Sequence, residues 1–327
     1  QLSLSYRHVW GELKRWEDVL GHELIIWEKG QSAKLTEFGS KLMWAERQTQ
    51  ARLAPQLEAL RADLERTFAV AFDPDAHVLT LYASHDDALP RLREQAATSG
   101  LHLDIRFCGS VDAIRALNEA RCTLAGFHTQ SRPHDNTHTA KAYRSLLQPG
   151  LHKIIGFATR TQGLITAAGN PMQLQSLRDV ARSQARFVQR SPGTGTRVLL
   201  DDLLAQDQLT ANDLNNWTDE EPSHTALAEA ISSGRCDVGL GIESTARARG
   251  LGFVPLVQEQ FHLVFLKSAL DTPATQALRS LLQTSAWQDT LNALPGYHTQ
   301  DSGHVQSLSQ QLPWWTFKQA KKSAHTR

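Results

Sequence analysis

The side chains best suited to hold a charged ligand lie in a segment of small and hydroxylated residues, 190–197, which follows a predicted strand, Arg186–Gln189. That segment reads Arg-Ser-Pro-Gly-Thr-Gly-Thr-Arg and leads into a helical pattern. Small residues let backbone N–H groups approach a ligand, and a helix N-terminus favours an anion, which Arg190 and Arg197 would neutralise. The Gly-Lys-Ser/Thr ending of a P-loop is missing, so the segment predicts anion binding without nucleotide hydrolysis. An ordinary capped turn is the alternative.

Hydroxyl and imidazole groups recur at other points where a predicted strand meets a predicted helix. Ligands of open α/β sheets bind at the carboxyl ends of the strands, so several such junctions predict one converging pocket for a small anion. Any single junction is better explained as a plain helix cap. The candidate effector-binding residues are Ser84, His85, Ser110, His128, Arg160, Gln162, Arg190, Gly193, Thr194, Gly195, Thr196, Arg197 and His224.

No set of reactive side chains in the sequence predicts a catalytic or metal site. His128, His134 and His138 share a polar loop, but no second ligand pair with suitable spacing lies nearby. Ser84-His85 and Ser223-His224 are sequence neighbours outside a G-x-S-x-G elbow, which argues against a hydrolase triad. We therefore expect no enzyme activity, no catalytic residue, no metal and no cofactor other than an effector anion.

The composition narrows the class of protein further. The chain has 327 residues with 34 basic and 34 acidic side chains, so bulk positive charge cannot hold it on nucleic acid. Its longest apolar runs are far shorter than the roughly 20 residues that span a bilayer. Cys108, Cys122 and Cys236 form no CxxC pair, which favours a reducing compartment. We expect a cytoplasmic protein with no membrane partner.

Strand and helix patterns alternate from about residue 76 onward, which predicts an α/β domain with a mostly parallel sheet. The predicted strands are Val78–Ala83, Leu103–Phe107, Cys122–Phe127, Lys153–Thr159, Gly163–Ala168, Arg186–Gln189, Val238–Ile242 and His262–Phe265.

The first 36 residues predict a helix, a short hairpin and the start of a second helix. Val9, Leu13, Trp16 and Leu20 have helical spacing, and a hairpin turn over residues 29–32 follows. This order suits a DNA-binding element, although a solvated amphipathic helix fits the composition equally well. The candidate DNA-binding residues are Ser3, Ser5, Tyr6, Arg7, His8, Lys14, Lys29 and Lys34.

A long helix is predicted from about Glu37 to about Val70. Its apolar residues alternate at spacings of three and four, close to the seam of a coiled coil, and Pro55 should kink or restart it near Leu53. A seam of this length favours a helix that joins two subunits in a homodimer or tetramer. Packing of the helix on its own domain is the alternative.

The N-terminal segments resemble the DNA-binding domain of ModE-type molybdate-responsive regulators. The resemblance covers residues 1 to about 70 and rests on residues 4–10, 20–24 and 33–39; LysR-type regulators have a related LT-x-x-G after the wing. It implies a winged helix-turn-helix that binds double-stranded operator DNA. It also implies that this chain begins inside the domain.

Residues 78–270 resemble the periplasmic-binding-protein-like domain found in molybdenum-related regulators and beside molybdopterin-biosynthesis proteins. The ordered matches are 125–128, 160–164, 169–171, 189–190, 193–197, 221–224, 233–242, 253–256 and Glu259. The resemblance implies an effector anion in a cleft, molybdate or tungstate first, then formate or a molybdopterin-type compound.

Together these patterns predict a transcriptional regulator of molybdenum- or tungsten-enzyme genes, such as those for formate dehydrogenase. A solute- or cofactor-binding protein of molybdenum metabolism without a role on DNA is the alternative. The fold is expected to be α/β, with a partial winged helix-turn-helix over 1–36, a linker and dimerisation helix over 37–72, and a two-lobed type 2 effector domain over 76–327. Lobe I would comprise 76–156 and 250–300 and lobe II 157–249, with crossings near Phe157 and Arg249.

Overall fold

The computed structural model describes residues 5–27, 32–72, 76–131 and 134–315. Two predicted DNA-binding residues, Ser3 and Lys29, lie outside the described residues. The chain divides into two compact units, 1–51 and 52–327.

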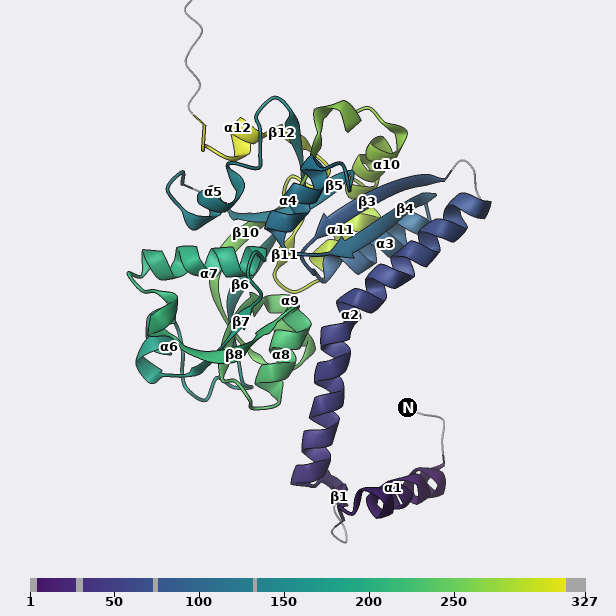
Figure 1. Ribbon diagram of the computed structural model, residues 1–327, viewed down its shortest axis with the longest axis vertical. Coiled ribbons are helices and arrows are strands. Elements are labelled where there is room, and N and C mark those ends of the chain that lie inside the picture. Colours follow the sequence, from purple (N-terminus) through teal and green to yellow (C-terminus); the bar gives the residue numbers. More distant parts are fainter. Residues whose placement is uncertain (1–4, 28–31, 73–75, 132–133, 316–327) are drawn as a thin grey trace, which may run out of the picture. The chain divides into compact units, whose positions relative to one another are not determined.

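The first unit contains the helix and the hairpin where the sequence predicts them (Figure 1). The Ser5 hydroxyl accepts a hydrogen bond from the backbone N–H of His8 and caps α1 (Tyr6–Leu20), and Gly21, with φ +67°, ends it. Strand β1 (Ile25–Ile26) pairs antiparallel with β2 (Lys34–Leu35). The helix α2 (Glu37–Phe72) begins directly after β2.

Thr36 and Gly39 join the hairpin to α2. The Thr36 hydroxyl donates to the Glu23 carbonyl at 2.7 Å and accepts from the Gly39 N–H at 2.9 Å. A Cβ on Gly39 would lie 2.2 Å from the Leu24 carbonyl oxygen. The Thr-x-x-Gly pattern therefore has a local physical cause, because a hydroxyl and a bare Cα are both needed at this junction.

Helix α2 continues through Pro55, where the sequence predicts a kink or restart. Proline cannot donate the hydrogen bond that residue 55 would make to the carbonyl of Ala51. The first unit ends at Ala51, whose carbonyl loses this hydrogen bond. The second unit begins at Arg52 and therefore contains the rest of α2, including Pro55.

The second unit is built on one mixed sheet of ten strands, in the order β4-β3-β5-β10-β6-β9-β7-β8, with β11 and β12 also paired to β6. The expectation of a mostly parallel sheet is wrong, because β10 pairs antiparallel with β5 and β6, and β6 pairs antiparallel with β9. The strands are β3 (His77–Ala83), β4 (Leu101–Phe107), β5 (Leu124–Gln130), β6 (His152–Thr166), β7 (Arg186–Arg190), β8 (Asn215–Glu221), β9 (Val238–Ile242), β10 (Gly252–Leu266), β11 (Tyr297–His298) and β12 (Val305–Ser307).

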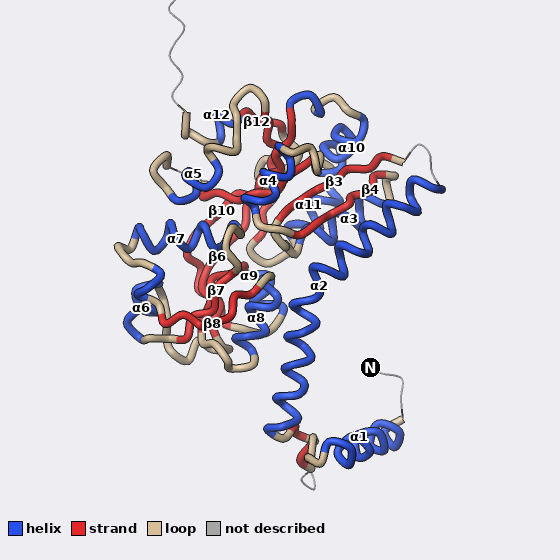
Figure 2. Tube along the Cα trace, viewed as in Figure 1, coloured by secondary structure: helices blue, strands red, loops and turns tan. Residues whose placement is uncertain are grey.

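Helices flank this sheet in two groups, one around β3, β4 and β5 and one around β7, β8 and β9 (Figure 2). Four apolar clusters of Leu, Ile, Val, Ala and Phe lie between helices and strands. The helices are α3 (Ala88–Ala97), α4 (Ser110–Asn118), α5 (His138–Tyr143), α6 (Leu177–Ser183), α7 (Gly195–Gln206), α8 (His224–Ser232), α9 (Glu243–Ala248), α10 (Pro273–Leu282), α11 (Ser285–Asn292) and α12 (Leu308–Gln311).

Two long strands join the two lobes of this unit. The predicted strands 153–159 and 163–168 are one strand, β6, which pairs with β12 and β11 near its start and with β9 near its end. Strand β10 pairs with β5 only from Glu259 onward. The chain therefore passes from one lobe to the other near residues 160–162 of β6 and 257–259 of β10. The sequence predicts these crossings near Phe157 and Arg249.

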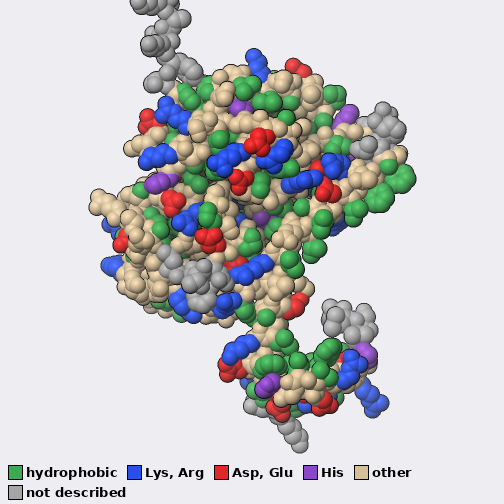
Figure 3. Space-filling view, in the orientation of Figure 1, with side chains coloured by type: hydrophobic (Ala, Val, Ile, Leu, Met, Phe, Trp, Pro, Cys, Tyr) green, Lys and Arg blue, Asp and Glu red, His purple; other side chains and the backbone are tan. Residues whose placement is uncertain are grey.

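Charged side chains of both signs are interspersed over the face of the second unit shown in Figure 3. This distribution agrees with the balanced totals of 34 basic and 34 acidic side chains. Within the described part of the chain, no helix is long and apolar enough to cross a membrane.

Candidate functional site

Arg190 ends strand β7 and is almost completely buried. Its Nε donates to the Glu221 carbonyl at 3.1 Å and its Nη2 to the Pro222 carbonyl at 2.9 Å, which fixes the guanidinium. Its Nη1 is buried without a hydrogen-bond partner among the described residues. Burial and the neighbouring Arg160 charge lower the pKa of Arg190 to about 9. The charges of Glu221 and Glu259 raise this pKa but do not restore it to its ordinary value, and an anion that accepts from Nη1 would stabilise the charged group further.

The turn after Arg190 has the geometry that the sequence predicts. Gly193 has φ +76°, and the Thr194 hydroxyl caps α7 by accepting from the N–H of Arg197. The N-terminus of α7, with its partial positive charge, therefore lies close along the chain to the Arg190 guanidinium.

A cavity of about 240 Å³ opens beside Arg190 and Thr194. Ser84, His85, Phe107, Cys108 and Gly109 line it from one lobe, and Arg190, Ser191, Pro192, Thr194 and Pro222 line it from the other. The third wall is α2, through Arg52, Pro55 and Gln56. Four of the candidate effector-binding residues, Ser84, His85, Arg190 and Thr194, thus share one cavity.

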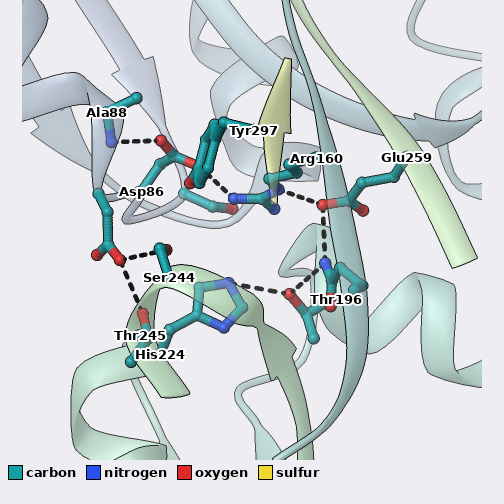
Figure 4. Close-up of polar contacts among 12 residues, drawn as sticks. Asp86, Ala88, Arg160, Thr196, His224, Ser244, Thr245, Glu259 and Tyr297 are labelled. Atoms are coloured by element: carbon teal, nitrogen blue, oxygen red, sulfur yellow. Dashed lines mark hydrogen bonds and ion pairs between the residues drawn. The ribbon is translucent and has the colours of Figure 1, made fainter. Parts of the chain in front are cut away.

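The surroundings of Arg160 do not fit the prediction that it binds an anion. It is fully buried, and its guanidinium donates to both the Asp86 and the Glu259 carboxylates (Figure 4). Burial alone would lower its pKa, but the charges of Glu259 and Asp86 raise the pKa of Arg160 above its ordinary value. Tyr297 also donates to Asp86, at 2.8 Å. The charge of Arg160 is therefore already compensated within the protein.

Thr196 and His224 lie next to this ion cluster (Figure 4), and Gln162 joins them to it in a polar chain. The Gln162 amide donates to the Thr196 hydroxyl at 3.1 Å and to the Glu259 carboxylate at 2.8 Å. The Thr196 hydroxyl lies 3.4 Å from His224 Nε2. These candidate residues are brought together, but they bind one another and do not line the cavity that contains Arg190.

The three histidines predicted to bind the effector have pKa values below the ordinary value of a histidine. Burial, which dominates, and the charge of Arg190 lower the pKa values of His85, His128 and His224. Gly195 packs against His128, because a Cβ there would lie 2.8 Å from His128 Nδ1. Of the three, only His85 lines the cavity around Arg190.

The surroundings of Arg197 do not fit the prediction that it binds the effector either. Its Nη1 donates to Gln189 and its Nε lies 3.5 Å from Asp201, and it does not line the cavity. The reason is helical geometry, because residue 201 lies one turn after residue 197 on α7 and offers a carboxylate on the same face. Arg190 and Arg197 thus differ in their surroundings, because only Arg197 has a carboxylate on its own helix as a neighbour and only Arg190 lines the cavity.

Ser110 and Gly193, the remaining predicted residues, lie at the rim of the cavity in different lobes. The Ser110 hydroxyl lies 3.2 Å from the Ser84 hydroxyl of its own lobe, and the N–H of the next residue, Val111, points at the Gly193 carbonyl of the other lobe at 3.4 Å. A Cβ on Gly109 would lie 2.8 Å from that same carbonyl. The lobes therefore approach closely at the rim of the cavity.

The α2 wall of the cavity is what sequence reasoning missed. Arg52 holds the Glu221 carboxylate with two hydrogen bonds, of 3.0 and 2.8 Å, and Glu221 is completely buried. Arg52 and Glu221 are 169 residues apart, and although Glu221 opens one of the matched segments, 221–224, nothing in the sequence links it to Arg52. Only the folded chain brings them together.

In the first unit, the predicted DNA-binding residues differ in their surroundings. Tyr6, Arg7 and His8 are exposed on the first turns of α1. Lys14 instead pairs with the buried Glu17 at 2.6 Å. Glu17 in turn accepts from the N–H of Leu24 at 2.7 Å, so this pair ties α1 to the hairpin.

The second unit thus has two lobes joined by two crossing strands, with a buried cation at a cavity between the lobes. A family described as the PBP superfamily domain matches residues 92–283. Because this match covers more than half of the chain, the chain belongs to that family.

The chain is similar to proteins of several kinds. It is 26% identical to the uncharacterised protein YvgK of Bacillus subtilis over 234 residues, 71% of this chain and 75% of that protein. A putative phosphate ABC transporter substrate-binding protein from Clostridium perfringens, solved with bound phosphate, gives a TM-score of 0.52 at 14% identity and covers 66% of this chain and 97% of that chain. Structural neighbours include effector domains of LysR-type regulators. The OxyR C206 mutant of Corynebacterium glutamicum gives a TM-score of 0.46 at 16% identity, covering 86% of this chain and 83% of that chain.

Proposed function

We propose that this protein is a cytoplasmic transcriptional regulator that binds a small anion between the lobes of its second unit. It has no enzymatic role and acts on double-stranded operator DNA through its first unit, as a homodimer or tetramer. By resemblance, the effector is molybdate, tungstate, formate or a molybdopterin-type compound, and the regulated genes serve molybdenum or tungsten enzymes.

The observation that carries the ligand site is the buried Arg190. Its guanidinium is fixed by two backbone carbonyls, and its remaining nitrogen has no partner among the described residues. The Ser84 and Ser191 side chains and the N-terminus of α7 add polar groups around the same cavity. An anion that binds only the folded chain stabilises it by RT ln(1 + L/Kd), where L is the free ligand concentration, so its melting temperature rises with the logarithm of the ligand concentration once that concentration exceeds Kd.

Thermal unfolding with molybdate, tungstate, sulfate, phosphate, formate and organic anions tests this site. We expect at least one anion to raise Tm in the wild type and to lose that effect in Arg190→Gln. Arg197→Gln is the matched control, because Arg197 belongs to the same segment but lies outside the cavity, and it should retain the shift. Equal anion effects in the wild type and Arg190→Gln would contradict the assignment.

The DNA-binding part of the proposal is supported by the capped α1, its exposed Tyr6, Arg7 and His8, and the Thr36–Gly39 junction. Selection of bound sites from random DNA should return a palindrome with half-sites about one helical turn apart. Arg7→Ala should weaken binding to that site, whereas the internally paired Lys14 should contribute mainly to folding. Recovery of random sequences would refute the role on DNA.

The alternative is a solute- or cofactor-binding protein without a role on DNA. The fold shared with the putative phosphate-binding protein favours this alternative, since the superposition covers 97% of that chain with a TM-score of 0.52. The two functions share the Arg190 cavity and differ only in the first unit. Anion binding without any selected DNA site would therefore support this alternative.

A further inference from the structure

The cavity beside Arg190 is larger than a simple oxyanion requires. Its volume is about 240 Å³. If each of four oxygens took the whole liquid volume of a water, about 30 Å³, a tetrahedral oxyanion would fill only about half of it. The other half needs either several waters or the body of a larger ligand.

The wall chemistry favours a larger ligand over water. Phe107 and the rings of Pro55, Pro192 and Pro222 line the cavity, and the His85 ring lies 5.0 Å from the ring of Phe107. Such apolar surfaces offer water few hydrogen bonds, whereas they suit the faces of a carbon ring. The cavity thus combines these apolar surfaces with polar side chains such as Arg190, Ser84 and Thr194, as in sites that orient an organic ligand.

Helix α2 supplies one whole side of this cavity. Arg52, Pro55 and Gln56 line it, and Arg52 is fixed by the Glu221 carboxylate. The Glu221 backbone carbonyl accepts from Arg190, so the anchor of α2 and the anion-binding arginine share one residue. The same helix is held to the other lobe by Glu58–Arg93 at 2.7 Å and Asp63–Arg106 at 2.7 Å.

We infer that the effector is a ring-bearing organic anion, a carboxylate or phosphate ester, whose charged group binds Arg190 and whose ring lies against Pro55 and Gln56 of α2. This inference rests on the proposed anion site and selects among its ligands. It makes α2 part of the binding site, so the ligand acts directly on the helix that continues to the first unit.

Titration calorimetry with paired anions tests the inference. Phosphate is compared with phenyl phosphate, and formate with benzoate and pterin-6-carboxylate. We expect at least one ring-bearing anion to bind about tenfold or more tightly than its simple counterpart, because its ring is buried in the apolar half of the cavity. Its binding should also slow amide hydrogen exchange over residues 52–58.

Positions 56 and 57 provide a matched pair of variants. Gln56 and Leu57 are exposed on a helix surface, so a substitution at either position should not prevent folding. Gln56→Trp fills the ring side of the cavity and should weaken the ring-bearing anion about tenfold or more while phosphate and formate bind as before. Leu57→Trp adds the same ring outside the cavity and should bind both kinds of anion like the wild type.

The outcomes separate the two proposals. If simple and ring-bearing anions bind equally and Gln56→Trp changes neither, the inference is wrong while the anion site stands. If no anion of either kind distinguishes the wild type from Arg190→Gln, the proposed anion site itself is wrong.

Discussion

Two buried arginines in the second unit show how similar residues can serve opposite purposes. Arg160 lies between the Asp86 and Glu259 carboxylates, which compensate its charge. Arg190 has only backbone carbonyls as fixed partners, and burial lowers its pKa to about 9. The first arrangement fixes strand β6 where it passes between the lobes, whereas the second leaves one nitrogen of a buried cation without a partner among the described residues.

Arg160→Met should therefore strongly destabilise the second unit. Removing one partner of a buried ion cluster leaves uncompensated charge, which costs about 3–5 kcal/mol. Urea unfolding followed by circular dichroism measures the change. Arg178→Met is the control, because Arg178 pairs with Asp207 at the surface and such pairs contribute only about 0–1 kcal/mol. Equal losses in both variants would contradict the argument.

His262 should make stability depend on pH. Burial lowers its pKa from 6.5 to about 4, so between these values the unfolded chain binds a proton that the folded chain does not. The free energy of unfolding therefore falls as the pH drops from 6.5 to 4, by about 3 kcal/mol from this residue.

Urea titrations at several pH values measure this loss. His262→Gln can retain the hydrogen bond to the Thr129 hydroxyl and should show a shallower acid slope. His298→Gln, at an exposed position, should keep the wild-type slope. If the free energy of unfolding of His262→Gln falls with pH as steeply as that of the wild type, the buried imidazole is not the cause of the loss.

At the scale of elements, the sequence predicts what is local. The turn over 190–197 and the hairpin before α2 lie where expected, because glycine, hydroxyl caps and apolar spacing determine them within a few residues. The single long β6 was missed, because Arg160 and Gln162 interrupt its apolar pattern and find their partners, Glu259 among them, far along the chain. The α2 wall was missed for the same reason.

Gly39→Ala tests the junction between the hairpin and α2. A Cβ there would lie 2.2 Å from the Leu24 carbonyl, so the backbone must shift. Hydrogen exchange over residues 5–40 should become faster and DNA binding should be lost. Gly11→Ala is the matched control, because no atom lies within 4 Å of its Cβ and alanine favours a helix by about 1 kcal/mol. It should slow exchange in α1.

At the scale of the molecule, the lobes are held closed by polar contacts across the cleft. Asp87 accepts from the Ser244 and Thr245 hydroxyls at 2.6 and 2.9 Å, and Asp202 accepts from the Thr139 N–H at 3.2 Å. A ligand that adds contacts to both lobes shifts the population toward this closed arrangement. A change in DNA binding then follows only if the closed form favours one arrangement of subunits.

Two subunits would contact each other along the exposed apolar side chains of α2. Leu57, Leu60 and Leu64 are 61%, 62% and 61% exposed, at the three-four spacing of a coiled-coil seam. Burying such side chains between two helices contributes about 1.5–3 kcal/mol each. We therefore expect a concentration-dependent dimer in sedimentation equilibrium, dissociated by Leu64→Lys, which buries a charge in the seam. Gln148→Lys adds the same charge at an exposed position of the second unit and should leave the dimer intact. If the wild type stays monomeric at all concentrations, α2 does not join two subunits.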